Sequence, residues 1–249
     1  MSAALTIAVI GEFQAGKSTL VNALLGRDEA EMGRGLSTTH ENRTYALSPF
    51  VSLVDTPGFN ADGQDDGTAK AAIDTADVLV YVHESNALGK SCVLEEVRAQ
   101  GKPIVFLLNC CDLGKWSPSA VQNAKIVASI EAKLETSGLL PFVVPVAGKI
   151  VFPLNVLWAR YGLGMEVDSN SEETLLERAG RCLRLPVAGT TSCNLRAKLL
   201  DESGYFPVRE FLMNLPLELL KHVVSNPKRE IDRIVDRFAE CLKKRWVAA

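Results

Sequence analysis

Several features typical of other protein classes are missing from this chain of 249 residues. It has no apolar run near the roughly 20 residues of a membrane span and no basic segment at its start, so we expect neither a span nor a secretory signal. Its six cysteines include no C-x-x-C pair, which favours reduced cytoplasmic thiols over a zinc site or disulfide framework. A net charge of −3 provides no general basic surface, so a nucleic-acid partner is not expected.

What the chain does have is a hydrophobic content of 47%, enough for a large core built from short apolar segments. These segments predict buried strands, and they alternate with stretches of helical periodicity. Such alternation predicts an α/β fold, a doubly wound and mostly parallel sheet with helices on both faces. Strands are expected over 5–10, 42–48, 51–55, 78–82, 104–108 and 142–146, and helices over 17–25, 91–100 and 117–136.

The second half of the chain carries weaker patterns. We expect the α/β domain to extend over 1–220, with 150–203 as an insertion that holds a helix over 171–183, followed by a helix over 204–220. Residues 221–249 are predicted to form an amphipathic helical arm with eight Lys or Arg and four Asp or Glu. The arm either packs on the domain, binds a partner helix or lies on a membrane surface. Its apolar stripe consists of Ile231, Ile234, Val235, Phe238, Cys241, Leu242 and Trp246.

Residues 11–18, Gly-Glu-Phe-Gln-Ala-Gly-Lys-Ser, match the pattern G-x-x-x-x-G-K-[ST] between a predicted strand and a predicted helix. The glycines let the backbone curl until successive N–H groups point at phosphate oxygens, and the helix N-terminus favours an anion. Lys17 would neutralise the β- and γ-phosphates, and the Ser18 hydroxyl would bind Mg²⁺. A chance match in a glycine-rich turn is the alternative, which the strand–loop–helix context argues against.

A second acidic position follows a buried strand. Asp55 ends the apolar segment 51–55 and precedes Thr-Pro-Gly. Ligands of open α/β sheets bind at the carboxyl ends of the strands, so Asp55 can hold Mg²⁺ opposite Ser18. Gly58 can then bring its N–H close to a γ-phosphate. The alternative is a surface turn, for which Asp, Pro and Gly are typical residues.

Together these two motifs resemble the translation-factor class of P-loop GTPases. The stretch from Gly11 to Gly26 is similar to that of the bacterial dynamin-like branch and, next, of the Era/TrmE-like branch. The resemblance extends from residue 5 to about 149, and it implies a Mg²⁺-dependent switch that binds GTP and GDP and hydrolyses GTP. It also implies that a first-switch hydroxyl, Thr39 or else Thr38, binds the metal. The phosphate site that it implies consists of Gly11, Gln14, Ala15, Gly16, Lys17, Ser18 and Thr19.

The guanine motif of this class, Asn-Lys-x-Asp, is similar to Asn-Cys-Cys-Asp over 109–112. Asp112 would accept hydrogen bonds from N1–H and the N2 amino group of guanine, while Asn109 would tie this loop to the phosphate loop. Cys110 replaces the lysine that covers the base, which is expected to lower affinity more than specificity. A plain strand-ending turn is the alternative. The class has Ser-Ala-Lys where this chain has Ala147 and Gly148, so the Gly148 N–H would bind guanine O6.

Hydrolysis is expected to be slow. Related enzymes carry a glutamine that orients the attacking water, and this chain has Phe59 there, which cannot do so. The resemblance implies the group of GTPases with a hydrophobic residue at this position, in which the fourth loop residue is often Asn or Ser and supports a monovalent cation such as K⁺ or the β–γ bridging region. This chain has Gln14 there, which is long enough to reach but is not the usual residue of the family. Catalysis would rest on Lys17, Gln14, Thr39 and Gly58, and a homodimer, K⁺ or a protein partner would raise the rate.

Other functions fit parts of the same pattern. A GTP- or GDP-dependent binding module without hydrolysis is favoured by Phe59, Gln14 and Cys110. A dynamin-like GTPase at a membrane surface is favoured by the basic arm, although the chain is short for a full stalk. A P-loop ATPase or kinase is disfavoured by Asp112. The expected location is the cytoplasm, at the periphery of a membrane in the dynamin-like case.

Overall fold

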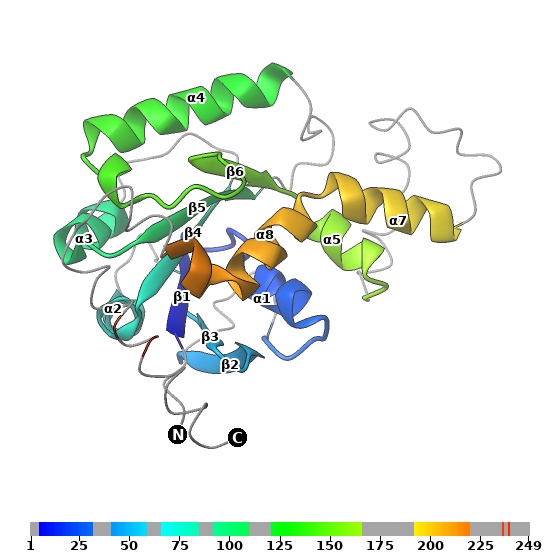
Figure 1. Cartoon of the computed structure of the whole chain (residues 1–249), viewed down its shortest axis with the longest axis horizontal. Coiled ribbons are helices and arrows are strands. Elements are labelled where there is room, and N and C mark those ends of the chain that lie inside the picture. Colours follow the sequence, from blue (N-terminus) through cyan, green and yellow to red (C-terminus); the bar gives the residue numbers. More distant parts are fainter. Residues whose placement is uncertain are drawn as a thin grey trace.

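The computed structural model describes residues 5–31, 41–58, 66–84, 92–109, 121–165 and 192–219, together with residues 236 and 239. Its centre is a six-stranded sheet in the order β2-β3-β1-β4-β5-β6, and among these strands β2 alone runs antiparallel to its neighbour (Figure 1). The expected doubly wound α/β fold is confirmed. The strands are β1 (Leu5–Gly11), β2 (Arg43–Ser48), β3 (Val51–Asp55), β4 (Val78–Glu84), β5 (Ile104–Asn109) and β6 (Val151–Leu154).

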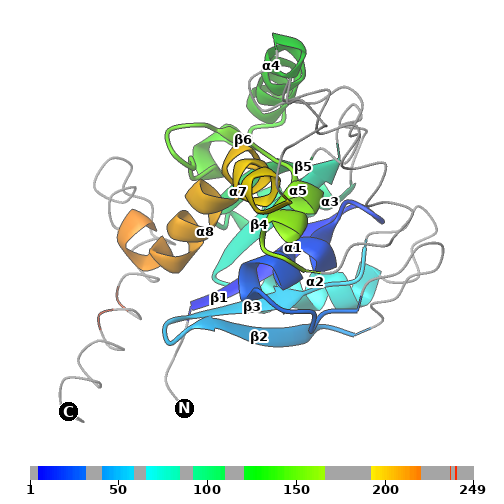
Figure 2. The same cartoon turned by 90° about the vertical axis from the view of Figure 1, so that its right-hand side faces the viewer.

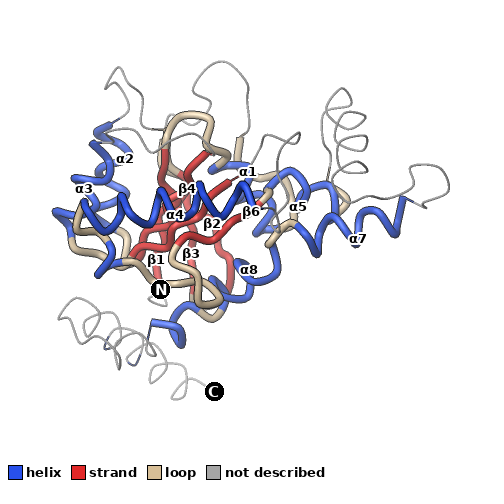
Figure 3. Tube along the Cα trace, turned by 90° about the horizontal axis from the view of Figure 1, so that it is seen from above, coloured by secondary structure: helices blue, strands red, loops and turns tan. Residues whose placement is uncertain are grey.

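Helices cover both faces of this sheet (Figures 2 and 3). One face packs against α1, α5 and α8, and the opposite face packs against α2, α3 and α4. Among the described residues, every helix is too short or too polar to cross a membrane. The helices are α1 (Lys17–Leu25), α2 (Asp66–Thr75), α3 (Cys92–Gln100), α4 (Val121–Thr136), α5 (Val156–Gly162), α7 (Ser192–Glu202) and α8 (Tyr205–Met213), with a 3₁₀ turn η1 (Leu140–Phe142).

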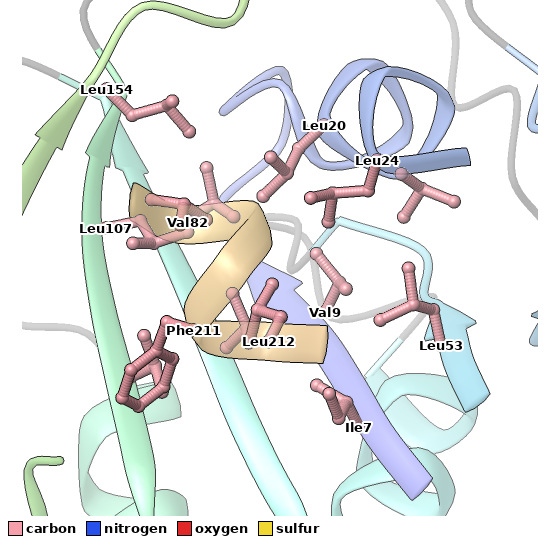
Figure 4. Packing of buried hydrophobic residues seen from close by; sticks show 14 of the residues in the cluster. Ile7, Val9, Leu20, Leu24, Leu53, Val82, Leu107, Leu154, Phe211 and Leu212 are labelled. Atoms are coloured by element: carbon pink, nitrogen blue, oxygen red, sulfur yellow. The ribbon is translucent and has the colours of Figure 1, made fainter. Parts of the chain in front are cut away.

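The strand β1 shows why its sequence is apolar without interruption. Successive side chains of a strand point to opposite faces, and here Ile7 and Val9 enter one core cluster while Ala8 and Ile10 enter the other. All four side chains are fully buried. In Figure 4, Ile7 and Val9 lie beneath α1 and α8, close to Leu212. The continuous apolar run therefore records a strand that is covered on both faces.

The predicted strand over 142–146 is wrong. Within it Val143 makes an isolated bridge to Ile104, and Val146 pairs with Lys149 across a two-residue turn. The sixth strand of the sheet is β6, which lies inside the stretch 150–203 that was expected to be an insertion. The expected start of an insertion at residue 150 is therefore wrong as well. The apolar run at 142–146 belongs to the connection between η1 and β6, where tertiary contacts, and not periodicity, decide which run pairs.

The structure also contains helices that the sequence patterns did not predict, namely α2, α5 and α7. The last two pack closely, because a Cβ on Gly162 would lie 2.5 Å from Leu200 Cβ and 2.8 Å from the Arg196 carbonyl oxygen. A seven-residue helix that ends in glycine has too little periodicity to stand out from a loop. The helix expected over 171–183 and the arm over 221–249, apart from residues 236 and 239, lie outside the described residues.

Lys102 caps the carboxyl end of α2 and gives a testable prediction for stability. Its buried Nζ donates to the carbonyl oxygens of Ile73, Asp74 and Ala76 at 2.6, 2.7 and 2.8 Å. Lys102→Met removes the charge and leaves these acceptors unpaired, so we expect it to lower the free energy of unfolding by about 2–3 kcal/mol. Chemical denaturation measures this change. The exposed Lys125 of α4 provides the matched control Lys125→Met, with an expected change within about 0.5 kcal/mol.

Candidate nucleotide-binding site

The predicted phosphate loop lies at the carboxyl edge of the sheet, between β1 and α1. Strand β3 is parallel to β1, and β5 is parallel to β4, which in turn is parallel to β1. The last residues of β3 and β5, Asp55 and Asn109, therefore end at this edge too. This is the edge at which open α/β sheets bind ligands. The fold therefore assembles three segments that are far apart in the sequence around one loop.

Two glycines allow the phosphate loop to adopt its shape. Gly11 has a φ of 151°, and a Cβ there would lie 2.2 Å from the Val82 carbonyl oxygen. Gly16 has a φ of 91°, and a Cβ there would lie 2.3 Å from Asn109 Nδ2. Gln14 also takes a left-handed conformation, with a φ of 60°, although it is not glycine. Strained backbone of this kind is concentrated at functional sites, where the surrounding structure holds it in place.

Lys17 is buried beneath the loop. The residue is 6% exposed, and its Nζ donates to the Glu12 carbonyl oxygen at 2.8 Å. Burial lowers the pKa of Lys17 from 10.5 to about 8, while the charges of Asp55 and Glu12 oppose that shift. The ammonium group is therefore held where water solvates it poorly. An anionic ligand in the loop would supply the charge compensation that the ammonium group lacks.

Asp55, at the end of β3, has an unusual environment for a carboxylate. It is 1% exposed, and its Oδ1 has no hydrogen-bond partner among the described residues. Burial raises the pKa of Asp55, against the opposing effects of a hydrogen bond with Ser18 and the charge of Lys17. An unpaired buried carboxylate oxygen beside a hydroxyl is a donor set that suits Mg²⁺. The described residues contain no cluster of three His, Cys, Asp or Glu, so phosphates and water would have to complete the coordination.

Gly58 and Thr56 shape the chain that follows Asp55. A Cβ on Gly58 would lie 2.7 Å from Phe13 Cα and 3.1 Å from Lys17 Nζ, so the Gly58 backbone packs directly against the phosphate loop. Thr56 is fully buried, and its Oγ1 donates to the Val9 carbonyl oxygen at 2.8 Å. This bond ties the segment to β1. Sequence reasoning assigned Thr56 no role, since a threonine in a turn carries no signal of such a contact.

Asn109 makes the contact that was expected of it. Its Nδ2 donates to the Ala15 carbonyl oxygen at 2.9 Å, which joins the end of β5 to the phosphate loop. Its Oδ1 accepts from the Val156 N–H at 3.3 Å, a contact that the sequence did not indicate. Asn155, which precedes Val156 in the chain, is buried and caps α5 through its Oδ1. The Nδ2 of Asn155 has no hydrogen-bond partner among the described residues. The start of α5 therefore lies beside Asn109, the first residue of the predicted guanine motif.

Ala147 and Gly148 lie elsewhere, so their predicted contact with guanine is wrong. They form a tight turn with φ values of 47° and 76°, closed by two hydrogen bonds between Val146 and Lys149. This turn precedes β6, whereas the Asn109 end of β5 pairs with the last residue of β6. Because β5 and β6 are parallel, the turn lies at the amino edge of the sheet. The carboxyl end of β6, followed by Asn155 and Val156, occupies the position that sequence reasoning gave to the turn.

The structure brings together one part of the predicted site. The predicted residues at the carboxyl edge are Gly11, Gln14, Ala15, Gly16, Lys17, Ser18, Thr19, Asp55, Gly58 and Asn109. The other predicted residues, Thr38, Thr39, Phe59, Cys110 and Asp112, lie outside the described residues. The roles assigned to these five stay predictions.

Comparison with known proteins finds similarity over the part of the chain that contains these segments. The family model described as "50S ribosome-binding GTPase" matches residues 6–110, from β1 through the phosphate loop to the end of β5. GTPase Der of Streptomyces coelicolor is 32% identical over 135 residues, which cover 50% of this chain and 28% of that protein. GTPase Der of Lachnoclostridium phytofermentans is 32% identical over 150 residues, which cover 55% of this chain and 34% of that protein. The chain thus spans about a quarter to a third of the length of the curated relatives it matches.

Among solved structures, Era in complex with MgGDPNP and nucleotides 1506–1542 of 16S ribosomal RNA is similar over 72% of this chain and 57% of that chain. The TM-score is 0.48 and the sequence identity is 16%. The similarity to GTPases therefore rests on the sequence matches and not on this structure. These matches cover the part of the chain that forms the phosphate loop and the strands beside it.

Proposed function

We propose that the chain carries a P-loop GTPase domain of the translation-factor class, which binds GTP and GDP at the carboxyl edge of the sheet and hydrolyses GTP with Mg²⁺. The observation that supports this most strongly is the burial of Lys17 and Asp55 beside one another under the loop. Folding places both charges where solvation is poor, and Asp55 Oδ1 stays unpaired among the described residues. A nucleotide phosphate and a cation together would compensate both groups.

Each part of the site has a distinct task in this proposal. Loop N–H groups and Lys17 bind the phosphates, and Gly58 is close enough to the loop for its N–H to reach a γ-phosphate. Ser18 and Asp55, with the predicted Thr39, would hold Mg²⁺, which would neutralise charge on the phosphates. Asn109 keeps the base-side loop attached to the phosphate loop. Asp112 would then select guanine over adenine.

We further propose that hydrolysis by the isolated chain is slow, and phosphate release tests this. Without a glutamine at position 59, no group of the predicted site orients water, and a missing catalytic element of this kind is worth ~10³–10⁵ in rate. The rate per molecule should rise with protein concentration or when K⁺ replaces Na⁺, because a second copy or a cation near Gln14 would supply what is missing. A rapid rate that changes neither with protein concentration nor when K⁺ replaces Na⁺ would show that one chain already positions the water.

The same measurement separates this proposal from a binding module without hydrolysis. Tight binding of GDP with no phosphate release, with and without K⁺, would favour the module. Gln14→Asn provides a matched variant, since asparagine tolerates the left-handed φ of 60° better than glutamine. We expect this variant to respond more strongly to K⁺ than the natural chain.

The wider setting of the chain is also a proposal. We infer a cytoplasmic protein whose nucleotide domain extends over 1–220 and whose arm over 221–249 binds a second copy, another protein or, as in dynamin-like proteins, a membrane surface. The Era structure contains ribosomal RNA, a ligand of that protein. For this chain the net charge of −3 still argues against nucleic acid as the main partner.

A further inference from the structure

Glu12, the second residue of the phosphate loop, is an acidic residue to which the proposed site gives no task. Among the described residues, the proposed phosphate and Mg²⁺ ligands are loop N–H groups together with Lys17, Ser18, Asp55 and Gly58. A carboxylate beside the loop meets a ligand of its own sign. Glu12 is half-buried, so water screens its charge only in part. This charge therefore acts on whichever nucleotide occupies the loop.

The backbone of Glu12 is in direct contact with the ammonium group of Lys17. The Glu12 carbonyl oxygen accepts a hydrogen bond from Lys17 Nζ at 2.8 Å. Because a carbonyl oxygen is about 2.4 Å from its own Cα, the Glu12 Cα lies within roughly 5 Å of this Nζ. In every rotamer the Glu12 carboxylate then lies within about one Debye length of the ammonium group at 0.1 M salt. Burial lowers the pKa of Lys17, and the charges of Asp55 and Glu12 oppose this shift, in agreement with that short separation.

The same part of the loop adjoins the position proposed for the γ-phosphate. A Cβ on Gly58 would lie 2.7 Å from Phe13 Cα and 3.1 Å from both Phe13 N and Lys17 Nζ. The peptide between Glu12 and Phe13, the Gly58 backbone and the Lys17 ammonium group therefore form one cluster. In the proposed function, Gly58 and Lys17 bind the γ-phosphate. Glu12 is thus attached to the loop beside that phosphate.

We propose that Glu12 is a specificity-determining residue that opposes the γ-phosphate and shifts the preference of the site from GTP toward GDP. The inference rests on the proposed binding of both nucleotides at this loop. GTP carries about one more negative charge than GDP at pH 7, and the terminal phosphate is where the two differ. Repulsion from the carboxylate therefore weakens the binding of GTP more than that of GDP. The residue acts through its charge and requires no contact with the nucleotide.

The test compares Glu12→Gln with Glu12→Asp in the full chain. Glutamine keeps the size of the side chain and removes its charge, whereas aspartate keeps the charge. Equilibrium titration with Mg²⁺ present measures the affinity of each variant for GDP and for a non-hydrolysable GTP analogue. We expect Glu12→Gln to raise the affinity for the analogue about three- to tenfold and the affinity for GDP less than about twofold. Glu12→Asp should keep the ratio of the two affinities within about twofold of that of the natural chain.

Salt dependence gives a readout that a merely structural role of Glu12 would not change. The gain of Glu12→Gln for the GTP analogue should shrink between about 0.05 M and 0.5 M salt, because added ions screen the repulsion. Glu135→Gln is the matched control. Glu135 is exposed in the last turn of α4, shortly before Val143 bridges to Ile104, the first residue of β5, so it lies toward the opposite edge of the sheet. This control should bind both nucleotides as the natural chain does.

Two results with Glu12→Gln would overturn the proposal. Equal changes in affinity for both nucleotides would show that Glu12 acts on the loop as a whole, and a gain that is independent of salt has the same meaning. A lower affinity for the GTP analogue would identify the carboxylate as a ligand of the cation. If the natural chain binds both nucleotides and the ratio stays unchanged in Glu12→Gln, this inference alone fails. If the natural chain binds neither nucleotide, the proposed function fails and the inference fails with it.

Discussion

Lys17→Met is expected to lower the affinity for GDP by more than about a hundredfold, while the nucleotide-free chain becomes more stable. Lys17 would donate at least two charge-assisted hydrogen bonds to phosphates, each worth roughly 1.5–3 kcal/mol. The same ammonium is buried in the free protein, where burial lowers its pKa to about 8. Methionine keeps the apolar stem without the buried charge. Titration with fluorescent GDP and chemical denaturation without nucleotide measure the two effects.

The gain in stability should depend on pH in a defined direction. Because the pKa of Lys17 is about 8 in the folded chain and 10.5 in the unfolded reference, the penalty is fully present below pH 8. It then fades as the pH rises toward 10.5. The full penalty is on the order of 3 kcal/mol, and the lost hydrogen bond to Glu12 offsets part of it. A methionine variant that binds GDP as tightly as the natural chain would show that the loop is not a phosphate site.

Gly16→Ala is expected to have the second largest effect, a loss of about ten- to a hundredfold in affinity for GDP. The new methyl group would lie 2.3 Å from Asn109 Nδ2, so Asn109 has to move away from the Ala15 carbonyl oxygen. A buried hydrogen bond lost in this way costs about 1–3 kcal/mol. Equilibrium titration with fluorescent GDP measures the change.

Gly26→Ala provides the matched control, because the two glycines share a left-handed backbone but differ in their surroundings. Gly26 has a φ of 70°, and a Cβ there has nothing within 4 Å. Both substitutions carry a backbone cost of about 1–2 kcal/mol. We therefore expect both variants to unfold more easily and Gly16→Ala alone to lose affinity. An equal loss of affinity in both variants would assign the effect to backbone strain and not to Asn109.

The sequence by itself determined the part of this protein that is encoded in short windows. The continuous apolar runs placed β1, β3, β4 and β5, and the apolar face that ends at Gly26 placed α1 over the residues where the structure has it. The motif at 11–18 predicted the phosphate loop, and the guanine motif that begins at Asn109 predicted the contact between the end of β5 and this loop. In each case a pattern of a few neighbouring residues has one dominant structural solution.

Tertiary structure alone decided the features that depend on residues far apart in the chain. The apolar runs at 142–146 and 151–154 look alike, and the pairing of β5 decides that the second run completes the sheet. That choice moves Ala147 and Gly148 to the opposite edge and puts Asn155 beside Asn109. The burial of Lys17 and the pairing of Arg160 with Asp28 follow from packing between separate elements. The residues next to a charged side chain in the sequence do not indicate which residue it pairs with. The free energy of such a contact depends on burial and on geometry that only the assembled fold supplies.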